Sequence, residues 1–300
     1  MIKYSELLKE KYGEKVYKIP VNTGGTCPNR DGTKGSGGCI FCSDTGASSE
    51  LLSEKMDILE QIETNIAFIR KKYKANKYII YFQNFTGTYL PLAQFSDYLN
   101  IVKGVENVVG IAVSTRPDCL DNGHLELLQA FRDETGIDIY IELGLQSAND
   151  KTLERLNRCH TLEDFINGSK KIKAFGFYLD VHIILNLPWD DISDVLKMAE
   201  VINSCSADSI KIHSLHIPYN TKLFELYKNN EFKLTTKEEY FYRLHIILSN
   251  INKNIAVQRL FSRAQKNEAA FCNWGTSWWK LEDEFRIYVR EGAIPPKTLK

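Results

Sequence analysis

The amino-acid sequence predicts an α/β fold built on a parallel sheet, and three observations support that prediction. Apolar runs rich in β-branched residues begin at Lys77, Val108, Asp138, Phe177 and Ser209. The runs recur at intervals of roughly 30 to 40 residues, the length of a strand and a crossover helix with their loops. The stretches between them have the apolar periodicity of amphipathic helices. Near-continuous apolar strands that alternate with helices indicate a parallel sheet covered on both faces.

The individual elements follow from the same pattern. An earlier strand at Lys15–Val21 precedes the five runs and gives six parallel strands. Helices are expected between the strands at Glu54–Tyr73, Leu92–Val102, Asn122–Arg132, Leu162–Ala174 and Ile192–Ser204. Beyond about Ile217 the regular period fades. The expected elements there are a helix, a strand and a closing helix at Thr236–Asn250, Ile255–Phe261 and Ser277–Val289.

Polar and small residues gather directly after four of the expected strands. They lie at Gln83–Thr88, Ser114–Asp118, Gln146–Asn149 and Asn186–Asp190. A parallel barrel collects its chemistry at the carboxyl rim of its strands, although an open doubly wound sheet also binds ligands there. Because several loops contribute at once, we predict a partial (β/α)6 TIM-like barrel over residues 1–216. Residues 217–300 are expected to form a C-terminal α/β extension packed on the barrel.

Composition limits the function classes that need consideration. The chain has 300 residues, of which 43% are hydrophobic and 25% charged, which argues against a disordered, collagen-like or membrane-spanning protein. Lys+Arg and Asp+Glu number 38 each, so nucleic acid or anionic lipid would have to be held by a local patch. The first twenty residues have no apolar core like that of a signal peptide. We therefore expect a cytoplasmic protein without membrane contact, whose seven cysteines are free thiols or metal ligands.

A glycine-rich loop between the first strand and the first helix carries three cysteines, Cys27, Cys39 and Cys42. Its six glycines would not suit a helix, but they allow the backbone to approach a bound group closely. A Cys-x2-Cys pair in a turn directs both sulfurs toward one centre. The loop is therefore expected to wrap a metal or a metal cluster.

Four interpretations of the three cysteines are open. A structural zinc site normally needs four ligands, and no further Cys or His follows before Cys119 and His124. A dithiol pair of Cys39 and Cys42 lacks the usual position just before a helix and leaves Cys27 unexplained. Three unrelated buried cysteines are the third interpretation. A [4Fe–4S] cluster with three protein ligands is the fourth and the favoured one, because it leaves one iron open for a substrate or cofactor.

Three cysteines that end in Cys-x-aromatic-Cys, with Phe41 before Cys42, resemble the radical S-adenosylmethionine superfamily. That resemblance implies a [4Fe–4S] cluster on the three cysteines, whose open iron chelates the amino and carboxylate groups of S-adenosylmethionine. The usual spacing is Cys-x3-Cys-x2-Cys, whereas eleven residues separate Cys27 from Cys39 here. The loop is similar to the YhcC-like branch, a relative of the Elongator catalytic subunit, in which a long first gap is typical.

The resemblance also implies cofactor contacts from the loops after the second and third strands. The loop after the second strand resembles a glycine-rich element whose backbone holds the methionine amino group, at Gln83, Thr86, Gly87 and Thr88. A plain strand-to-helix turn is the alternative. Ser114 and Arg116 lie in Ser-Thr-Arg-Pro-Asp, which is similar to the Elongator-like Glu-Thr-Arg-Pro-Asp with Ser114 in place of the acid. An arginine at this rim can hold a carboxylate through two hydrogen bonds.

The strongest of these further motifs joins Gln146 to Arg158. In coproporphyrinogen-dehydrogenase-like and Elongator-like members, a Gln twelve residues before an Arg contacts the ribose, and the Arg contacts the methionine carboxylate. Gln146 and Arg158 have that separation, although Arg158 could instead lie on a solvated helix face. The fifth strand resembles a family stretch in which backbone near Leu187 lines the adenine and Pro188 fixes the turn. His182 on that strand is either a cofactor contact or a hydrogen-bonded core residue.

The catalytic residues are not identified by any motif, and three candidates remain. Glu142 would point from mid-strand into the barrel, where an unpaired carboxylate is costly, so it is either paired or close to the reaction. Cys159 adjoins the expected cofactor arginine, and Cys272 lies in an aromatic-rich tail. Each is either a reactive thiol or a buried structural one. His213 and His216 after the sixth strand either face the substrate or simply pack.

The resemblance implies a radical S-adenosylmethionine enzyme with flavodoxin or ferredoxin as the electron donor. Such an enzyme cleaves its cofactor reductively to a 5′-deoxyadenosyl radical, which abstracts hydrogen from the substrate. A tRNA base is the expected substrate by analogy with Elongator-like relatives, and a small molecule or peptide is the alternative. Two basic clusters could hold tRNA or be solvated helix faces, namely Arg70, Lys71, Lys72, Lys74 and Lys77, and Lys253, Arg259, Arg263 and Lys266. A non-catalytic, zinc-stabilised nucleic-acid-binding protein is the alternative from another class.

Overall fold

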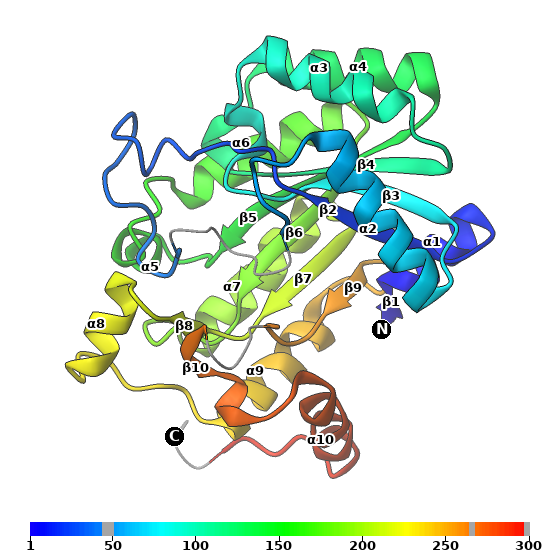
Figure 1. Cartoon of the computed structure of the whole chain (residues 1–300). Helices are drawn as coiled ribbons and strands as arrows, with labels where there is room; N and C mark the ends of the chain where they lie inside the picture. Colours follow the sequence, from blue (N-terminus) through cyan, green and yellow to red (C-terminus); the bar gives the residue numbers. More distant parts are fainter. Residues whose placement is uncertain (44–50, 264–267, 297–300) are drawn as a thin grey trace.

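A computed structural model gives the structure of residues 1–43, 51–263 and 268–296. Its centre is a curled half-barrel sheet of eight strands, and every neighbouring pair in it is parallel (Figure 1). In sheet order the strands are β1 (Ile2–Lys3), β9 (Ala256–Arg259), β7 (Ser209–His213), β6 (Tyr178–Ile184), β5 (Asp138–Gln146), β4 (Val108–Thr115), β3 (Lys77–Phe82) and β2 (Val16–Val21). The predicted partial barrel and its six strands, β2 to β7, are confirmed.

The helices that follow these strands return across the outer face of the sheet. They are α2 (Ile58–Tyr73), α3 (Leu92–Lys103), α4 (Asn122–Thr135), α6 (Leu162–Ala174) and α7 (Ile192–Ser204). All five were predicted, but α2 begins later than the expected Glu54. The Asp57 side chain accepts a hydrogen bond from the backbone N–H of Leu59 and thereby sets the first turn.

Two strands outside the six repeating units extend the sheet. The predicted strand near Ile255–Phe261 is β9, which pairs with β7 from Ser209 opposite Ala256 onward. The short β1 lies beyond it and was not predicted. The division into residues 1–216 and 217–300 stays a prediction, and β9 from the second part lies in the sheet of the first.

Shorter elements and the C-terminal helices complete the described chain. The α-helices are α1 (Tyr4–Tyr12), α5 (Asp150–Arg155), α8 (Lys222–Lys228), α9 (Lys237–Asn250) and α10 (Trp278–Arg290). Three 3-10 turns are η1 (Gly87–Tyr89), η2 (Pro117–Cys119) and η3 (Asn273–Gly275), and an antiparallel pair is formed by β8 (His216–Pro218) and β10 (Ala269–Cys272). The predicted helices at Thr236–Asn250 and Ser277–Val289 correspond to α9 and α10.

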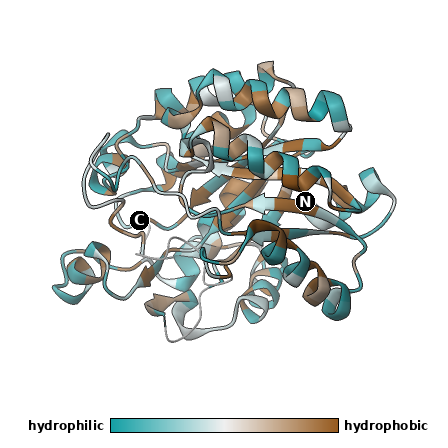
Figure 2. Cartoon of the chain, turned by 45° about the horizontal axis from the view of Figure 1, so that its top comes forward, coloured by the Kyte–Doolittle hydropathy of each residue, from teal (hydrophilic) through white to brown (hydrophobic). Residues whose placement is uncertain are grey.

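The apolar core lies between the sheet and its outer helices. Strand residues such as Ile80, Ile111 and Val181 are fully buried there, and Figure 2 shows hydrophobic colouring concentrated on the strands. On the inner face, Tyr4 and Leu8 of α1 pack with an apolar cluster at the amino end of the half-barrel. The carboxyl ends of the strands therefore form the face on which a site can be built. Among the described residues, no helix is both long and apolar enough to cross a membrane.

Candidate active site

The cysteine loop follows β2 and is anchored by backbone hydrogen bonds to three other parts of the chain. The N–H of Thr86 after β3 donates to Thr26 O at 3.3 Å. Ile40 N donates to Leu156 O at 3.1 Å, and Leu223 N of α8 donates to Ile40 O at 2.9 Å. The loop therefore lies across the carboxyl end of the sheet, as the sequence predicts, and the C-terminal extension helps to hold it there.

Each of the three cysteine sulfurs faces the guanidinium group of a different arginine. The contacts are Arg116 Nη1 to Cys27 Sγ at 4.0 Å, Arg158 Nη1 to Cys39 Sγ at 3.5 Å, and Arg30 Nη1 to Cys42 Sγ at 3.9 Å. Nearby positive charge favours the thiolate, which is the form that binds metal. The sequence motifs indicated Arg116 and Arg158 as cofactor contacts, but they gave no role to Arg30.

The cysteines fit the [4Fe–4S] interpretation by their chemistry. All three are free thiols, and a turn in which Cys42 N donates to Cys39 O at 2.9 Å joins two of them. Burial and the neighbouring Cys39 raise the pKa of Cys42 to about 11, a cost that metal charge would relieve. Within the described ranges, no group of three or more His, Cys, Asp or Glu side chains could hold one metal ion. An iron–sulfur cluster does not require that, because it offers each sulfur its own iron.

Gln146 and Arg158, which the sequence predicts as a pair, converge over Gly144. A Cβ atom added at Gly144 would lie 2.7 Å from Gln146 Nε2 and 3.1 Å from Arg158 Nη2. The Arg158 side chain is buried, and its Nη2 donates to Gly144 O at 3.3 Å. Its Nε donates to Nε2 of His160 at 3.0 Å, so His160, which no motif indicated, also fixes the guanidinium. The two predicted cofactor residues thus lie together beside Cys39.

Arg116 makes a bidentate hydrogen-bonded ion pair with Asp118. Its Nε and Nη2 donate to the two carboxylate oxygens of Asp118 at 2.9 and 3.1 Å. The same Nη2 donates to Arg158 O at 2.6 Å, while Nη1 faces Cys27. Arg116 therefore connects the loop after β4 to the cysteine loop and to the backbone of the second arginine. A direct cofactor contact by Arg116, or by the neighbouring half-buried Ser114, stays a prediction.

The loop after β3 lies tightly against β4. A Cβ at Gly87 would lie 2.7 Å from Val113 Cγ1 and 3.1 Å from Ser114 O, so only glycine fits this approach. Thr88 Oγ1 lies 2.5 Å from Thr115 Oγ1 and is used in packing. Thr86 Oγ1 is buried and has no hydrogen-bond partner in the described part of the chain, which suits a ligand contact. Gln83 is half-buried at the end of β3.

Glu142 lies inside the half-barrel and is fully paired. Its carboxylate forms ion pairs with Lys18 and Lys211 and accepts hydrogen bonds from Tyr81 and from His182 Nε2, the latter at 2.6 Å. Burial alone would raise its pKa, but Lys18 and Lys211 hold the pKa of Glu142 well below its usual range. Of the two predicted alternatives for Glu142, pairing is the one this structure contains, and its catalytic role stays a prediction. Neither lysine was predicted, although a charged residue inside an apolar strand is a usable signal.

The loop after β6 carries Leu187 and Pro188 and is braced from the C-terminal part of the chain. Leu187 is fully buried and Pro188 is half-buried. Arg243 of α9 donates through Nη2 to Asp190 O at 2.6 Å, and Asn186 Oδ1 accepts a hydrogen bond from the backbone beyond β7 at 2.6 Å. The backbone expected to line the adenine is therefore held from two sides.

The remaining cysteines fall in different environments. Cys159 is exposed, adopts a positive φ of 53° and donates to Asn29 Oδ1 at 3.1 Å. Cys272 is half-buried on β10. Both stay candidates. Cys205 is buried, whereas Cys119 is half-buried in η2, a short 3-10 turn that begins at Pro117.

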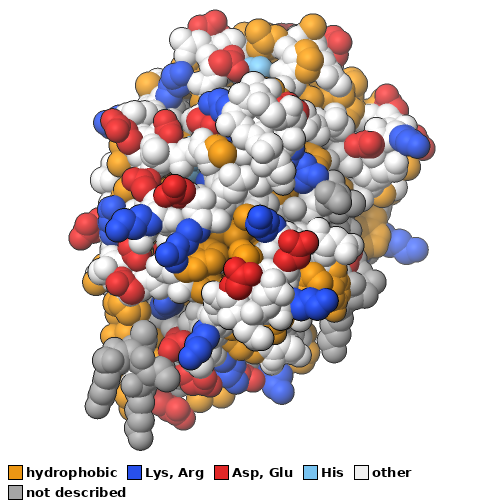
Figure 3. Space-filling model, turned by 90° about the vertical axis from the view of Figure 1, so that its left-hand side faces the viewer, with side chains coloured by type: hydrophobic (Ala, Val, Ile, Leu, Met, Phe, Trp, Pro, Cys, Tyr) orange, Lys and Arg blue, Asp and Glu red, His pale blue; other side chains and the backbone are white. Residues whose placement is uncertain are grey.

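Figure 3 shows the face of the molecule toward which the strands point. Hydrophobic side chains lie in a hollow near its middle, and Lys/Arg and Asp/Glu side chains are interspersed around it. This face therefore offers an apolar recess with a rim of mixed charge.

Comparisons with known proteins place this arrangement in a family. The profile of the radical SAM (S-adenosylmethionine) superfamily matches residues 21–201, and that of the radical SAM C-terminal domain matches residues 207–290. The uncharacterized protein YtqA of Bacillus subtilis is 30% identical over 274 residues, which are 91% of this chain and 84% of YtqA. Escherichia coli YhcC is 28% identical over 97% of this chain and 93% of its own length. A tRNA uridine(34) acetyltransferase of Methanocaldococcus jannaschii is 29% identical over only 44% of this chain and 24% of its own length.

Solved structures agree on the fold. Elp3 of Methanocaldococcus infernus superposes with a TM-score of 0.68 at 18% identity, covering 93% of this chain and 64% of that one. Coproporphyrinogen III oxidase (HemN) of Escherichia coli superposes with a TM-score of 0.51 at 14% identity, covering 78% of this chain and 50% of that one. The sequence profiles and the relatives YtqA and YhcC show that the chain belongs to the radical SAM superfamily of enzymes, in its YhcC-like branch.

Proposed function

We propose that this chain cleaves S-adenosylmethionine reductively at a [4Fe–4S] cluster held by Cys27, Cys39 and Cys42, and that the resulting 5′-deoxyadenosyl radical abstracts hydrogen from the substrate. The observation that carries the proposal is the pairing of each cysteine sulfur with its own arginine on a radical SAM fold. When bound, the cluster would supply an electron, and its open iron would hold the cofactor.

The other rim residues have roles that follow from their positions. Arg158 would hold the methionine carboxylate with its guanidinium, and Gln146 beside it would contact the ribose. The close backbone approach at Gly87 would leave carbonyl and N–H groups for the methionine amino group. Backbone at Leu187 would line the adenine, in a loop braced by Arg243. The protein's contribution is placement of the cofactor, which accounts for much of the rate gain in such reactions.

Apolar packing around the cysteine loop would keep water from the reacting atoms. Ile40, Leu156, Leu187 and Leu223 form one buried cluster, and Phe41 packs against it. The cluster joins the cysteine loop to α8 of the C-terminal part. Exclusion of water protects a reactive radical from side reactions.

Anaerobic purification tests the cofactor proposal. The wild-type protein should be brown, with about four irons and four sulfides per chain, as a [4Fe–4S] cluster requires. Cys27→Ala, Cys39→Ala and Cys42→Ala should each lose that content, whereas Cys205→Ala, the matched control at a buried cysteine on the outer side, should keep it. One zinc per chain and no iron would defeat the proposal. That outcome would restore the zinc-stabilised alternative, which membership of an enzyme superfamily otherwise disfavours.

A product assay then tests the chemistry. After reduction with dithionite, the loaded protein should convert S-adenosylmethionine to methionine and 5′-deoxyadenosine, detected by mass spectrometry. Absence of 5′-deoxyadenosine from a sample with intact, reduced cluster would reject reductive cleavage. The physiological electron donor is proposed to be flavodoxin or ferredoxin, and a cytoplasmic location that keeps the thiols reduced belongs to the same proposal.

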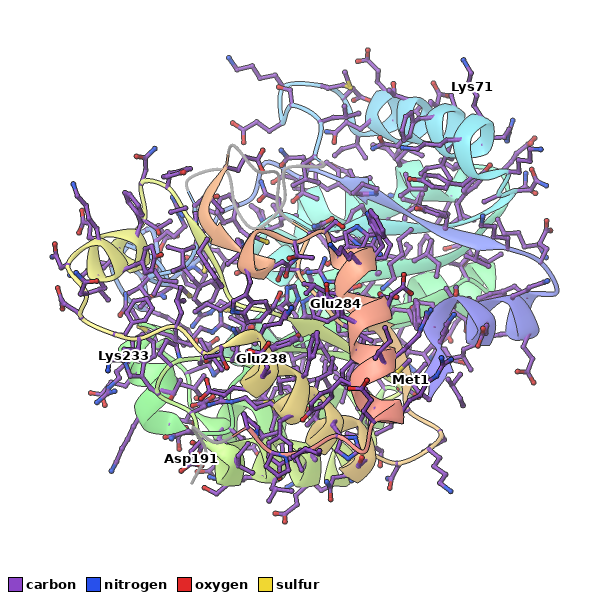
Figure 4. The ribbon with its side chains drawn as sticks, turned by 90° about the horizontal axis from the view of Figure 1, so that it is seen from below. Met1, Lys71, Asp191, Lys233, Glu238 and Glu284 are labelled. Atoms are coloured by element: carbon purple, nitrogen blue, oxygen red, sulfur yellow. The ribbon has the colours of Figure 1, made fainter. Side chains whose placement is uncertain are left out.

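We further propose a tRNA base as the substrate, and its support comes from the tRNA uridine(34) acetyltransferase relatives. The two basic clusters predicted from the sequence, around Lys71 and around Arg263, do not add support for a tRNA substrate. The first lies at the end of α2, directly before β3 and hence at the opposite end of the barrel from the cysteine loop, and Figure 4 shows Lys71 there at the outer surface. In the second, Arg259 lies inside the half-barrel and Arg263 stacks over Trp278 at 4.2 Å. Lys266 lies outside the described residues.

A small molecule or peptide is the second candidate substrate, and the rim of mixed charge favours it. Retention of tRNA that weakens steeply with added salt would support the first candidate, because phosphate contacts release counterions. Retention that ignores salt would favour the second. Comparison of modified nucleosides and metabolites from cells with and without the protein would then identify the substrate.

A further inference from the structure

The inside of the half-barrel is lined by two layers of polar side chains that the proposed chemistry does not use. Strand register defines them, because residues paired across parallel strands lie at one level. The lower level joins Ser114, Glu142, Asp180 and Ser209. The upper level, two residues nearer the carboxyl ends, joins Gly144, His182, Lys211 and Arg259. Lys18 of β2 reaches both carboxylates from the opposite side.

The two layers differ in charge and in exposure. Both carboxylates are in the lower layer, and the Glu142 and Asp180 side chains are 0% and 1% exposed. The lysines that pair with them are more open, with side-chain exposures of 17% for Lys18 and 13% for Lys211. Lys18 is in register with Asp138 and lies toward the amino ends of the strands, whereas Lys211 and Arg259 lie above the carboxylates. Negative charge is therefore buried in the lower layer, and the upper layer carries positive charge, with Lys211 partly exposed to solvent.

A chain of hydrogen bonds runs from Arg259 down to Glu142. Arg259 Nη2 lies 2.6 Å from His213 Nδ1, His213 Nε2 lies 3.4 Å from His182 Nδ1, and His182 Nε2 lies 2.6 Å from Glu142 Oε2. The same Nη2 also lies 3.1 Å from His213 Nε2. A guanidinium can only donate, so the shorter contact makes Nδ1 of His213 the acceptor; in that tautomer His213 donates its N–H to His182, and His182 donates its own to Glu142. Both histidines are thereby neutral, and burial lowers the pKa of His182 to about 4, which agrees.

The upper layer is consequently rich in donors. Lysine and arginine side chains have no acceptor, and the acceptor capacity of both histidines points into the chain of hydrogen bonds just described. A ligand that enters from above meets Arg259 and Lys211, which are donors with positive charge. The matching ligand group is an anion with several acceptor oxygens.

This layer also lies next to the residues assigned to the cofactor. Gly144, whose carbonyl accepts from Arg158, is paired in register with His182 of the upper layer. A group bound on the upper layer would therefore lie inside the half-barrel just below the rim. That is where a substrate must lie if a radical formed at the rim is to reach it.

We propose that the substrate carries a carboxylate or a phosphate group and that Arg259 and Lys211 bind this group inside the half-barrel. The inference rests on the proposed function, since it names the substrate class of the same site. It applies to both candidate substrates, because a tRNA base can be presented with a neighbouring phosphate and a metabolite can carry either anion.

Titration of the purified protein with simple anions tests the proposal. Sodium phosphate and sodium acetate are the two probes, added at constant ionic strength with chloride as the balancing salt. At least one should raise the melting temperature of the wild-type protein in a saturable way, by about 2 °C at tenfold excess over its Kd. A response to phosphate alone assigns a phosphate-bearing substrate, and a response to acetate alone assigns a carboxylate.

Three variants make the result specific. Arg259→Gln should lose the saturable rise, Arg259→Lys should keep a weaker one with at least a several-fold higher Kd, and Arg286→Gln, at an exposed arginine of α10, should match the wild type. The rise is compared within each variant, so a lower starting melting temperature does not affect the test. No saturable rise in the wild type, or an unchanged rise in Arg259→Gln, would overturn the proposal.

The outcome is separable from the test of the proposed function. Formation of 5′-deoxyadenosine together with no anion response would reject the anion site alone. A saturable anion response without iron or 5′-deoxyadenosine would reject the radical chemistry and leave the anion site as a property of the fold.

Discussion

The rim and the interior of the half-barrel are both polar, but they are built in opposite ways. The rim is made of loops, and several of its non-glycine residues adopt positive φ angles, namely Phe85, Gln146, Asn157 and Cys159. The interior is made of strands with regular register, and its charges are paired across them. Positive φ at a non-glycine residue costs stability and persists only where the surroundings impose it. The strained backbone of the rim therefore lowers the stability of the fold while it positions the cofactor-binding residues. The paired charges of the interior raise its stability.

The pKa values of two buried carboxyl groups, Glu142 in the interior and Asp190 at the rim, show the same contrast. In the interior, Lys18 and Lys211 hold the pKa of Glu142 well below its usual range despite burial. At the rim, burial raises the pKa of Asp190 to about 6, because hydrogen bonds from Thr152 and Ser147 and the charge of Arg243 offset only part of the loss of water. Substitution of each group should accordingly change stability in opposite directions.

The largest expected effect comes from Glu142→Gln. Loss of this negative charge leaves Lys18 and Lys211 buried beside a single carboxylate, and breaking a buried ion pair costs about 3–5 kcal/mol of unfolding free energy. Urea denaturation at pH 7.5 measures it. Glu134→Gln is the control at an exposed glutamate paired with Lys103, and it should cost less than about 1 kcal/mol.

The same experiment addresses the catalytic candidacy of Glu142. A variant with wild-type unfolding free energy but no product formation would assign Glu142 to the reaction and contradict the pairing argument. A variant that loses stability and, once folded at low temperature, still forms 5′-deoxyadenosine would confirm a supporting role.

The contrast also explains how much could be predicted from the sequence. The rim could be predicted, because Cys39–Cys42, the Gly144–Gln146 segment and Arg158 lie in short motifs with fixed spacing. The six strands and their helices could be predicted from hydrophobic periodicity. In the interior, the sequence predicted that Glu142 points inward, but its partners could not be predicted, because Lys18 and Lys211 lie on separate strands and meet it only through strand register. Arg30 was missed for a related reason, since its contact with Cys42 depends on how a glycine-rich loop folds back.

Asp190→Asn should stabilise the protein, and the gain should depend on pH. The pKa of Asp190 is about 6 in the folded chain against 3.8 ordinarily, so the folded state binds the proton more tightly. Its stabilising effect is present below pH 4 and is lost as the pH rises through 6. The asparagine side chain does not ionise, so the unfolding free energy of Asp190→Asn should exceed that of the wild type by up to about 3 kcal/mol at pH 7.5. At pH 4 the two should have the same unfolding free energy.

Thermal melting of Asp190→Asn at both pH values checks this prediction. Thr152 Oγ1 donates to Asp190 Oδ1 at 2.6 Å, and an asparagine oxygen can keep that bond. Asp97→Asn, at an exposed position of α3, serves as the control and should behave the same at both pH values. An equal gain for Asp190→Asn at pH 4 and pH 7.5 would show that charge at Asp190 is not responsible.

The smallest expected change in stability, with a clear change in binding, belongs to Gly144→Ala. The new methyl group would press on Gln146 Nε2 and Arg158 Nη2, which are ends of flexible side chains that can move aside at little cost. The fold should therefore keep its melting temperature within a few degrees. The displaced groups, however, are the two assigned to the cofactor, and misplacement by less than 1 Å is costly where geometry matters.

Binding of S-adenosylmethionine to Gly144→Ala should therefore weaken about 10-fold, or about 1.4 kcal/mol, as measured by equilibrium dialysis. Gly104→Ala, where the nearest contact would be an ordinary 3.5 Å, should leave the Kd unchanged. Equal affinity in Gly144→Ala and the wild type would remove Gln146 and Arg158 from the cofactor site, and with them the placement of the cofactor above the interior layers.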